Sequence, residues 1–358
     1  MTRPELRPLT SVRGIFAWAV VAYHIRLAMV GWAPASVVDA MGHGYLAVDI
    51  FFILSGFVIW LNYGDRLSGR AAIADFLVRR LARIWPLHAT MLGFGLAVAL
   101  ALLLTGRAIP DLPLPMLPLH LLMIQDWGFS DALQWNVPAW SISAEWAAYL
   151  LAPLVALCLS RRPLSTLTLI ATAALPLLLL FLLLQGSGER FSISEYGTPR
   201  CLGEFFCGAA VSRLWMRWRG DRVAEALCWL VGTLLFASWW WGAPETLALP
   251  FAFATLLLAL ALGAERPRHI LSGRAIHWLG EISYATYLSH YLLFFAFKLA
   301  FVRDAGNVPP GQIAAYLLIV LVASAGLYHL VERPAQRTIL RAWGARRTPT
   351  PQGTPASA

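Results

Sequence analysis

Charged residues are scarce in this chain. Asp, Glu, Lys and Arg make up 13% of its 358 residues, whereas 59% of the residues are hydrophobic. A soluble domain carries about twice that share of charge. The composition therefore excludes an ordinary soluble protein and indicates an integral membrane protein.

Cysteine is also rare, and internal repeats are missing. Cys158, Cys201, Cys207 and Cys228 form no CxxC pair, and no cluster of histidines accompanies them. Isolated cysteines in apolar segments are typically buried, unreactive thiols. The sequence thus predicts no metal site, and it shows no repeat of the kind that marks the inverted halves of many transporters.

Long apolar runs dominate the chain instead. Each run has about 20 residues, which is enough to cross a hydrocarbon layer of roughly 30 Å. These runs predict an all-α integral membrane protein, a bundle of about ten transmembrane helices. The expected spans are residues 11–31, 45–63, 87–105, 139–159, 164–185, 198–217, 223–241, 247–264, 277–301 and 311–331.

The basic residues indicate how these spans are oriented. The net charge is +9, and when the spans alternate across the membrane, most of the 28 Lys and Arg residues fall on one side. Positive residues collect on the cytoplasmic side of membrane proteins. Both termini are therefore expected in the cytoplasm, with the chain in the inner membrane of a bacterium, and the positive charge requires no nucleic-acid partner.

Two long segments between spans differ in character. Residues 64–86 are basic and expected in the cytoplasm, whereas residues 106–138 are Pro-rich and expected outside. The second segment contains LHLLMIQDW, which is too short to cross the membrane and so lies in the interface or re-enters the bilayer. Residues 1–340 are expected to form the transmembrane domain, and residues 341–358 a disordered cytoplasmic tail.

The first span carries two polar residues, Arg13 and His24. They are about three helical turns, or roughly 16 Å, apart and share one helix face. Arg13 is expected at the cytoplasmic surface and His24 beyond the middle of the membrane, where an ionisable side chain usually serves a function. A histidine that satisfies an interhelical hydrogen bond is the alternative.

The second span contributes Asp49, the only acid in GYLAVDIFFILSGFVIW. An unpaired buried carboxylate is costly, and consecutive spans are usually neighbours. His24 is therefore its expected partner, and a carboxylate there would prepare the imidazole to act as a general base. Ser55 and Gly56 in the same span allow another helix to approach closely, for function or for packing alone.

Three arginines follow in DFLVRRLARIWPLH. Arg79, Arg80 and Arg83 are expected at the cytoplasmic surface. Arg80 and Arg83 are one helical turn apart, so their guanidinium groups can converge on a polyanion. Ordinary positive-inside topology explains them equally well.

The fourth span begins with NVPAWSISAEWAAYL. Glu145 lies inside the apolar run with Ser141 and Ser143 nearby, whereas Trp140 also suits an anchor at the membrane interface. Together with the acid and the histidine of the first two spans, Glu145 indicates a polar cavity within the membrane.

Later spans add weaker candidates. Arg200 and Glu204 are four residues apart, so they can neutralise each other on one helix. His290 lies in ISYATYLSHYLL with Tyr284 and Tyr287. A structural or topological role explains these residues better than a chemical one.

Taken in order, these segments resemble the acyltransferase family 3 membrane proteins, which acylate extracytoplasmic polysaccharides and related molecules. The resemblance rests on an arginine followed after ten residues by a histidine, an SGF segment, an RxxR pair, and the stretches WSISAEW, RCLGEF and SYATYLSH. It covers most of the chain. It implies a stand-alone member, without the carboxy-terminal SGNH-type domain that some members carry.

The resemblance implies a membrane-bound O-acyltransferase. Such an enzyme would move an acyl group, expected to be acetyl, from cytoplasmic acyl-CoA to a hydroxyl of an extracytoplasmic carbohydrate or glycolipid. Acetyl-CoA is then a co-substrate, and no cofactor is bound permanently. The acceptor stays open among O-antigen sugars, exopolysaccharide, peptidoglycan and lipid-linked oligosaccharide. The oligomeric state stays open as well, with a dimer as one alternative.

Roles for individual residues follow from the same resemblance. His24 is expected to act as general base or acyl carrier, with Asp49 or Glu145 orienting it. The donor is expected to bind Arg13, Arg79, Arg80 and Arg83. The remaining motif residues, in substrate-binding or structural roles, are Ser55, Trp140, Ser143, Arg200 and His290.

Two other classes of function stay open. A polytopic transporter would use His24, Asp49 and Glu145 as a proton relay. A non-catalytic assembly subunit would need none of the three for acylation or transport.

Overall fold

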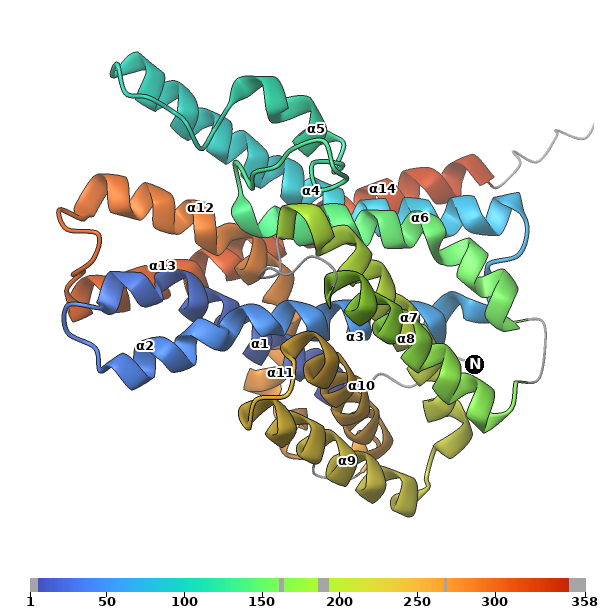
Figure 1. Cartoon of the computed structure of the whole chain (residues 1–358). Helices are drawn as coiled ribbons and strands as arrows, with labels where there is room; N and C mark the ends of the chain where they lie inside the picture. The colour runs from blue at the N-terminus through green and yellow to red at the C-terminus, as the bar shows by residue number, and fades with distance from the viewer. Residues whose placement is uncertain (1–5, 161–163, 186–192, 267–268, 348–358) are drawn as a thin grey trace, which may run out of the picture.

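A computed structural model describes residues 6–160, 164–185, 193–266 and 269–347. In this part of the chain the regular elements are all helices, and no strand occurs. Figure 1 shows the helices packed into one bundle, with the chain wound back and forth along it. The expected all-α fold is confirmed.

The α-helices differ widely in length. They are α1 (Arg7–Ile25), α2 (Ala35–Gly42), α3 (Ala47–Tyr63), α4 (Arg70–Leu104), α5 (Leu117–Leu121), α6 (Trp140–Ser160), α7 (Thr166–Gln185), α8 (Ile193–Trp218), α9 (Arg222–Trp240), α10 (Glu245–Gly263), α11 (Arg274–Glu281), α12 (Ser283–Phe301), α13 (Pro310–Leu327) and α14 (Arg333–Arg347).

Among the described residues, seven helical runs are long and apolar enough to cross a membrane. The expected spans 139–159, 198–217 and 277–301 correspond to α6, α8 and α11–α12, which are not among these seven. α8 and α12 place polar side chains inside the bundle, such as the fully buried Glu204 and His290, and this lowers their apolar content. The protein is a multi-pass helical bundle, whereas the count of ten spans and the orientation stay predictions.

Two expected boundaries change. α4 begins at Arg70 and continues through Pro86, so most of segment 64–86 is the first part of a long helix and not a connecting loop. The expected span 277–301 is broken at Ile282 into α11 and α12. The hydroxyl of Ser283 donates to the carbonyl of Gly280 at this break.

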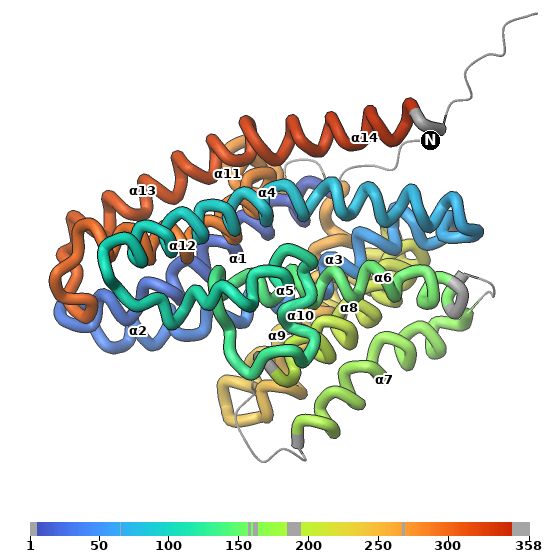
Figure 2. The backbone as a smooth tube through the Cα atoms, turned by 90° about the horizontal axis from the view of Figure 1, so that it is seen from above, coloured from blue at the N-terminus to red at the C-terminus, as the bar shows by residue number. Residues whose placement is uncertain are grey.

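The carboxy-terminal helices form one long rod. α13 passes through a π-helical turn, Tyr328–Glu332, into α14, which ends at Arg347. Figure 2 shows α13 and α14 running along one edge of the bundle. Residues 341–347, expected to be disordered, are therefore helical, and residues 348–358 lie outside the described residues.

The closest helix packing joins α3 and α8. Gly56 of α3 lies against the carbonyl oxygen of Phe205, and Gly208 of α8 lies against the carbonyl oxygen of Ile53. At both positions an added Cβ atom would overlap backbone. Small residues allow this approach of two membrane helices, and they bring the polar residues of α3 and α8 together.

Two peripheral helices face outward. α9 lies at the lower edge of the view in Figure 1, and α7 lies at the edge of the bundle in Figure 2. Only 17% of the most apolar stretch of α9 and 22% of that of α7 is buried. Apolar side chains exposed in this way are expected where helices contact lipid.

The cysteines form no pair among the described side chains. Cys201, Cys207 and Cys228 are free and buried, as expected for unreactive thiols. The side chain of Cys158 lies outside those the structure describes.

Candidate active site

A cavity of about 150 Å³ opens between α1, α3, α4, α6 and α12. These helices meet in the middle of the bundle (Figure 1). Polar side chains from all of them reach the cavity, which is otherwise lined by apolar residues of α3, α4 and α6. The polar residues are Arg13, Ser55, Arg80, Arg83, Ser141, Glu145, Tyr149, Ser283, Tyr284 and Tyr287.

Three guanidinium groups line this cavity. Arg80 donates to the hydroxyl of Tyr63 at 3.1 Å, and its Nε has no hydrogen-bond partner. Arg83 pairs with Glu332, which is 1% exposed. Arg13 forms no ion pair within 4 Å with the residues that the structure describes, and it lines the same cavity as Glu145. The three guanidinium groups therefore have two carboxylates beside them, those of Glu145 and Glu332.

Glu145 is the carboxylate on the opposite wall. Ser55 of α3 donates to its Oε1 at 2.5 Å, and Tyr149 donates to the same oxygen at 2.6 Å. Tyr149 follows Glu145 by one helical turn, so the spacing i, i+4 places both on one face of α6. The carboxylate is thereby held toward the arginines, and it forms no hydrogen bond with His24 among the described residues.

His24 has a second histidine as its partner. Nε2 of His290 on α12 lies 3.1 Å from Nδ1 of His24. That Nδ1 also lies 3.0 Å from the carbonyl oxygen of Val20, one turn earlier in α1. His290 is fully buried, whereas His24 is partly exposed.

The histidine pair adjoins the cavity through Tyr287. Tyr287 lines the cavity, and its ring centre lies 6.2 Å from that of His290. The hydroxyls of Tyr287 and Ser141 are hydrogen-bonded to each other at 2.7 Å, and they lie 3.1 and 3.0 Å from the carbonyl oxygen of Pro138. Tyr287 therefore borders both the arginine-lined cavity and His290.

A family model described as an acyltransferase domain matches residues 9–329. The chain belongs to this acyltransferase family. The resemblance found in the sequence motifs is thus confirmed over nearly the whole chain. No solved structure gives a significant match.

Curated relatives of this acyltransferase share about a quarter of its residues. Acyltransferase MdmB of Streptomyces mycarofaciens is 28% identical over 97% of this chain and 96% of its own length. Exopolysaccharide production protein ExoZ of Rhizobium meliloti (strain 1021) is 28% identical over 85% of this chain and 92% of its own. The putative peptidoglycan O-acetyltransferase YrhL of Bacillus subtilis (strain 168) is 24% identical over 94% of this chain but 56% of its own.

The expected pairing of Asp49 with His24 is wrong. In this acyltransferase Asp49 pairs with Arg200 of α8, and Arg200 also contacts Glu204 at 3.5 Å. Asp49 and Glu204 are almost completely buried. The pairing follows from the close approach of α3 and α8 at their glycines, which adjacency along the chain does not reveal.

Arg79 also departs from its expected place. Its side chain is 44% exposed and donates from Nε to Asp75 at 2.7 Å. It does not line the cavity, and its guanidinium instead pairs with Asp75, one turn earlier in α4. Of the four arginines expected at the donor, the cavity thus brings together Arg13, Arg80 and Arg83.

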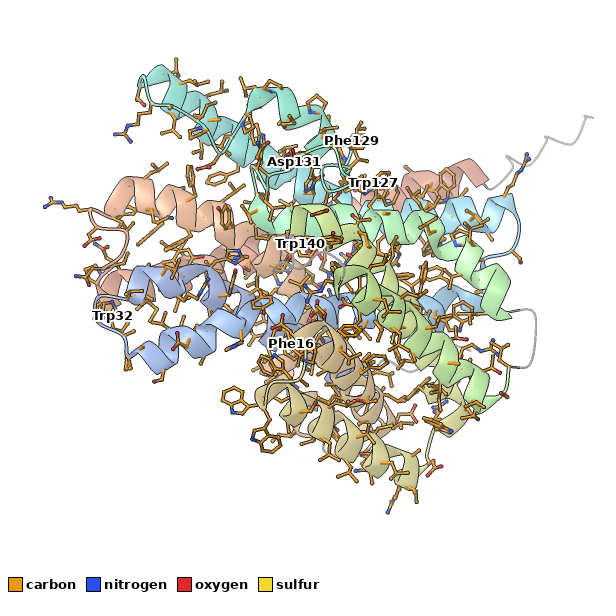
Figure 3. All side chains as sticks on the ribbon, viewed as in Figure 1. Phe16, Trp32, Trp127, Phe129, Asp131 and Trp140 are labelled. Carbon is orange, nitrogen blue, oxygen red and sulfur yellow. The ribbon has the colours of Figure 1, made fainter. Side chains whose placement is uncertain are left out.

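Trp140 and Ser143 anchor the segment that precedes α6. Ser143 accepts from the backbone N–H of Asp126 at 3.1 Å, and its carbonyl accepts from Trp127 at 3.0 Å. Trp140 is buried against Phe52, with ring centres 5.7 Å apart. Figure 3 shows Trp127 on this segment near Trp140 at the start of α6. These contacts give both residues a structural role.

Asp126 is a buried acid outside the spanning helices. Burial raises its pKa to about 8, although the hydrogen bond from the Thr198 hydroxyl to Oδ2 opposes this rise. Its Oδ1 has no hydrogen-bond partner. A neutral carboxyl is the form that such a site favours.

Two residues hold the arginines of the cavity in pairings that the sequence did not predict. Tyr63 bonds Arg80 from the end of α3, and Glu332 pairs with Arg83 from the π-helical turn. For Tyr149 the spacing of one turn from Glu145 was a usable signal. Among the described residues no group of three or more His, Cys, Asp and Glu is placed to hold a metal ion.

Proposed function

We propose that this protein transfers an acyl group, acetyl by preference, from acyl-CoA on the cytoplasmic side to a hydroxyl of an extracytoplasmic carbohydrate or glycolipid. The observation that carries the proposal is the adjacency of two sites. Tyr287 lines the cavity that contains the arginines, and its ring also lies beside His290 of the histidine pair. The first suits an anionic donor, and the second suits proton transfer.

The donor is assigned to the arginines of the cavity. Arg13, Arg80 and Arg83 outnumber the carboxylates beside them by one. Phosphate groups form strong, charge-assisted hydrogen bonds with guanidinium groups. CoA carries its phosphates at one end and its thioester at the end of a long arm. With the phosphates at the arginines, the arm would extend toward Tyr287 and the histidines.

His24 is assigned as the group that activates the acceptor. As a general base it would take the proton of the acceptor hydroxyl while that oxygen bonds to the thioester carbon. The carbon–sulfur bond then breaks, and the CoA thiolate leaves and takes up a proton. As an acyl carrier, a nitrogen of His24 would first attack the thioester carbon and release the same thiolate. The acceptor oxygen would then take the acyl group, while the bond from the carbon to the nitrogen breaks and the acceptor proton passes to that nitrogen. Both routes require the free nitrogen of His24.

The names of the relatives support a carbohydrate acceptor. One is a putative peptidoglycan O-acetyltransferase, and another is an exopolysaccharide production protein. Both acceptors are polymers with free hydroxyl groups outside the cytoplasmic membrane. Hydroxyl acylation on that side of an inner membrane is therefore the activity that we assign to this chain.

An assay with purified protein tests this function. Detergent-solubilised protein is incubated with acetyl-CoA and extracted cell-envelope glycans, and both free CoA thiol and acetylated glycan are measured. We expect His24→Ala to abolish glycan-dependent thiol release. His43→Ala is the matched control, because His43 is exposed, its ring packs against that of Trp239, and it does not line the arginine cavity. Full activity of His24→Ala, or gradient-driven uptake without acylation, would overturn the proposal.

The donor site has a test of its own. Arg80→Gln is expected to raise the KM for acetyl-CoA about tenfold or more, since a hydrogen bond to a charged group contributes about 1.5–3 kcal/mol. The KM for acetyl-pantetheine, which lacks the phosphates, should change little. Arg79→Gln, one position away and outside the cavity, should leave both KM values unchanged.

A further inference from the structure

Two backbone carbonyls determine where the protons of the histidine pair lie. A carbonyl oxygen can only accept a hydrogen bond. The oxygen of Thr286 is 3.2 Å from Nδ1 of His290, and the oxygen of Val20 is 3.0 Å from Nδ1 of His24. Both Nδ1 atoms therefore carry the proton of their ring.

The bond between the rings then has one direction. A neutral imidazole has a single N–H, so Nε2 of each ring carries a lone pair. The single N–H of His24, at Nδ1, is then shared between the carbonyl oxygen of Val20 at 3.0 Å and Nε2 of His290 at 3.1 Å. The reverse direction would turn a lone pair of each ring toward a carbonyl oxygen. Nε2 of His24 is left with its lone pair and no partner within the described part of the chain.

We propose that His290 is the positioning residue of the acyl transfer, which holds His24 in the tautomer and ring orientation that present Nε2 as the base. This inference rests on the proposed function of His24. Beside a functional histidine, the group that accepts its N–H and fixes its orientation is usually a carboxylate. Here the acceptor is a neutral imidazole, which avoids the cost of placing an unpaired charge inside the membrane.

The other neighbours of the two histidines do not replace His290 as the hydrogen-bond acceptor of His24. Tyr23 and Tyr291 flank His24 with their ring edges, at 5.0 and 5.4 Å between centres. Arg26, from the turn after α1, stacks on Tyr23 with its guanidinium 3.9 Å from the ring centre. No carboxylate contacts either histidine ring among the residues that the structure describes.

His290 is itself held in place. Tyr287, one turn earlier, packs beside its ring. From α13, Tyr316 donates to the backbone carbonyl of His290 at 2.9 Å, and Tyr316 is fully buried. A residue that positions another must have a fixed orientation of its own, and these contacts supply it.

Three substitutions of His290 separate positioning from packing. The amide oxygen of Gln reaches the place of Nε2 and can accept from His24, whereas that of Asn reaches only the place of Nδ1. Leu fills the space without an acceptor. We expect His290→Leu and His290→Asn to lower kcat about 10- to 100-fold, the range seen when the partner of a functional histidine is lost at metal sites. His290→Gln should restore kcat to within a few-fold of wild type.

The donor KM distinguishes this role from a general disturbance. Because His290 does not line the arginine cavity, the KM for acetyl-CoA should stay unchanged in all three variants. Equal activity of the Gln and Asn variants, or an unaffected kcat in His290→Leu, would overturn the proposal. If His290→Leu does not fold, comparing the kcat of His290→Gln with that of His290→Asn still tests the role of His290. The two proposals fail separately. If His24→Ala is inactive but the His290 variants give one of these overturning outcomes, the proposed function stands and only the role of His290 is rejected.

Discussion

Asp49, Arg200 and Glu204 place two carboxylates on one guanidinium in the core of the bundle. Asp49 is 1% exposed and Glu204 is 0% exposed. Breaking a buried ion pair by removing one partner typically costs about 3–5 kcal/mol, because the other charge is left buried and unpaired. At this position we expect Arg200 to join α3 to α8 and not to take part in acyl transfer.

Arg200→Met should therefore lower the free energy of unfolding by about 3–5 kcal/mol. The change leaves two acids without their shared cation in an apolar interior. Arg79→Met is the matched control, since its exposed pair with Asp75 contributes only about 0–1 kcal/mol. Chemical unfolding in detergent measures both, and equal stability of the two variants would show that the buried pair is not a structural link.

Asp126 makes the stability depend on pH. Burial raises its folded-state pKa to about 8 from an ordinary value of 3.8. Between these values the folded protein keeps a proton that the unfolded chain has lost, so the free energy of unfolding falls as the pH rises through this window. The slope from this group is at most about 1.4 kcal/mol per pH unit.

Asp126→Asn should flatten this part of the profile. Thermal unfolding in detergent at pH 5 and pH 8 gives the measurement, and the difference between the two pH values should shrink. Asp131→Asn, an exposed position in the same segment that is labelled in Figure 3, should keep the wild-type difference. If Asp126→Asn keeps the wild-type difference in thermal unfolding between pH 5 and pH 8, Asp126 is not the source of the pH dependence.

At the scale of the helices, glycines set the distances between elements. α3 and α8 approach at Gly56 and Gly208. α1 and α11 approach at Gly14 and Gly280, where a Cβ on Gly14 would come within 2.7 Å of the Gly280 backbone nitrogen. α1 carries Arg13 and His24, and α3 carries Ser55 of the cavity wall. Small residues at these contacts therefore determine how the polar groups of different helices meet.

Gly56→Ala and Gly208→Ala should each destabilise the protein by about 1–3 kcal/mol. The added methyl would overlap the backbone carbonyl of the facing helix, and overpacking typically costs this amount. Gly93→Ala is the control, because a Cβ at Gly93 meets nothing within 4 Å and alanine favours the helix. The prediction fails if the midpoints of thermal unfolding of the Gly56 and Gly93 variants coincide.

At the scale of the whole molecule, the direction of transfer depends on orientation. α4 has 35 residues, which at 1.5 Å per residue gives a length of about 50 Å, well beyond the roughly 30 Å of a hydrocarbon layer. We expect its apolar second half, residues 87–105, to cross the membrane, so its two ends should lie on opposite sides. Arg80 and Arg83 lie in the half that follows the turn at residues 64–69, so the donor side is the side of that turn.

Cysteine labelling tests this orientation. With a cytoplasmic N-terminus, Ser68→Cys should react with a membrane-impermeant maleimide only after the inner membrane is opened. Arg107→Cys, beyond the other end of α4, should react in cells whose outer membrane alone is permeable. The described native cysteines are buried and give little background. The opposite pattern would place the arginines outside and remove the argument for a cytoplasmic acyl-CoA.

Much of this protein was predictable from local sequence. Apolar runs about 20 residues long can only be helices in lipid, because their backbone must satisfy its own hydrogen bonds. The shared face of Arg13 and His24 follows from helical periodicity alone. The motifs from WSISAEW to SYATYLSH, together with the earlier ones, led to the acyltransferase family, which the family match over residues 9–329 confirms.

Only the tertiary structure decided the partners of the polar residues. Asp49 was expected to pair with His24. In the structure Asp49 forms an ion pair with Arg200, and His24 forms a hydrogen bond with His290. Residues 266 apart in the chain meet in the second case. Each helix interior is determined by its own sequence, but which helices touch depends on how closely their backbones can pack. How closely two helices pack depends on small residues in both of them, so the sequence of one helix does not reveal its partner.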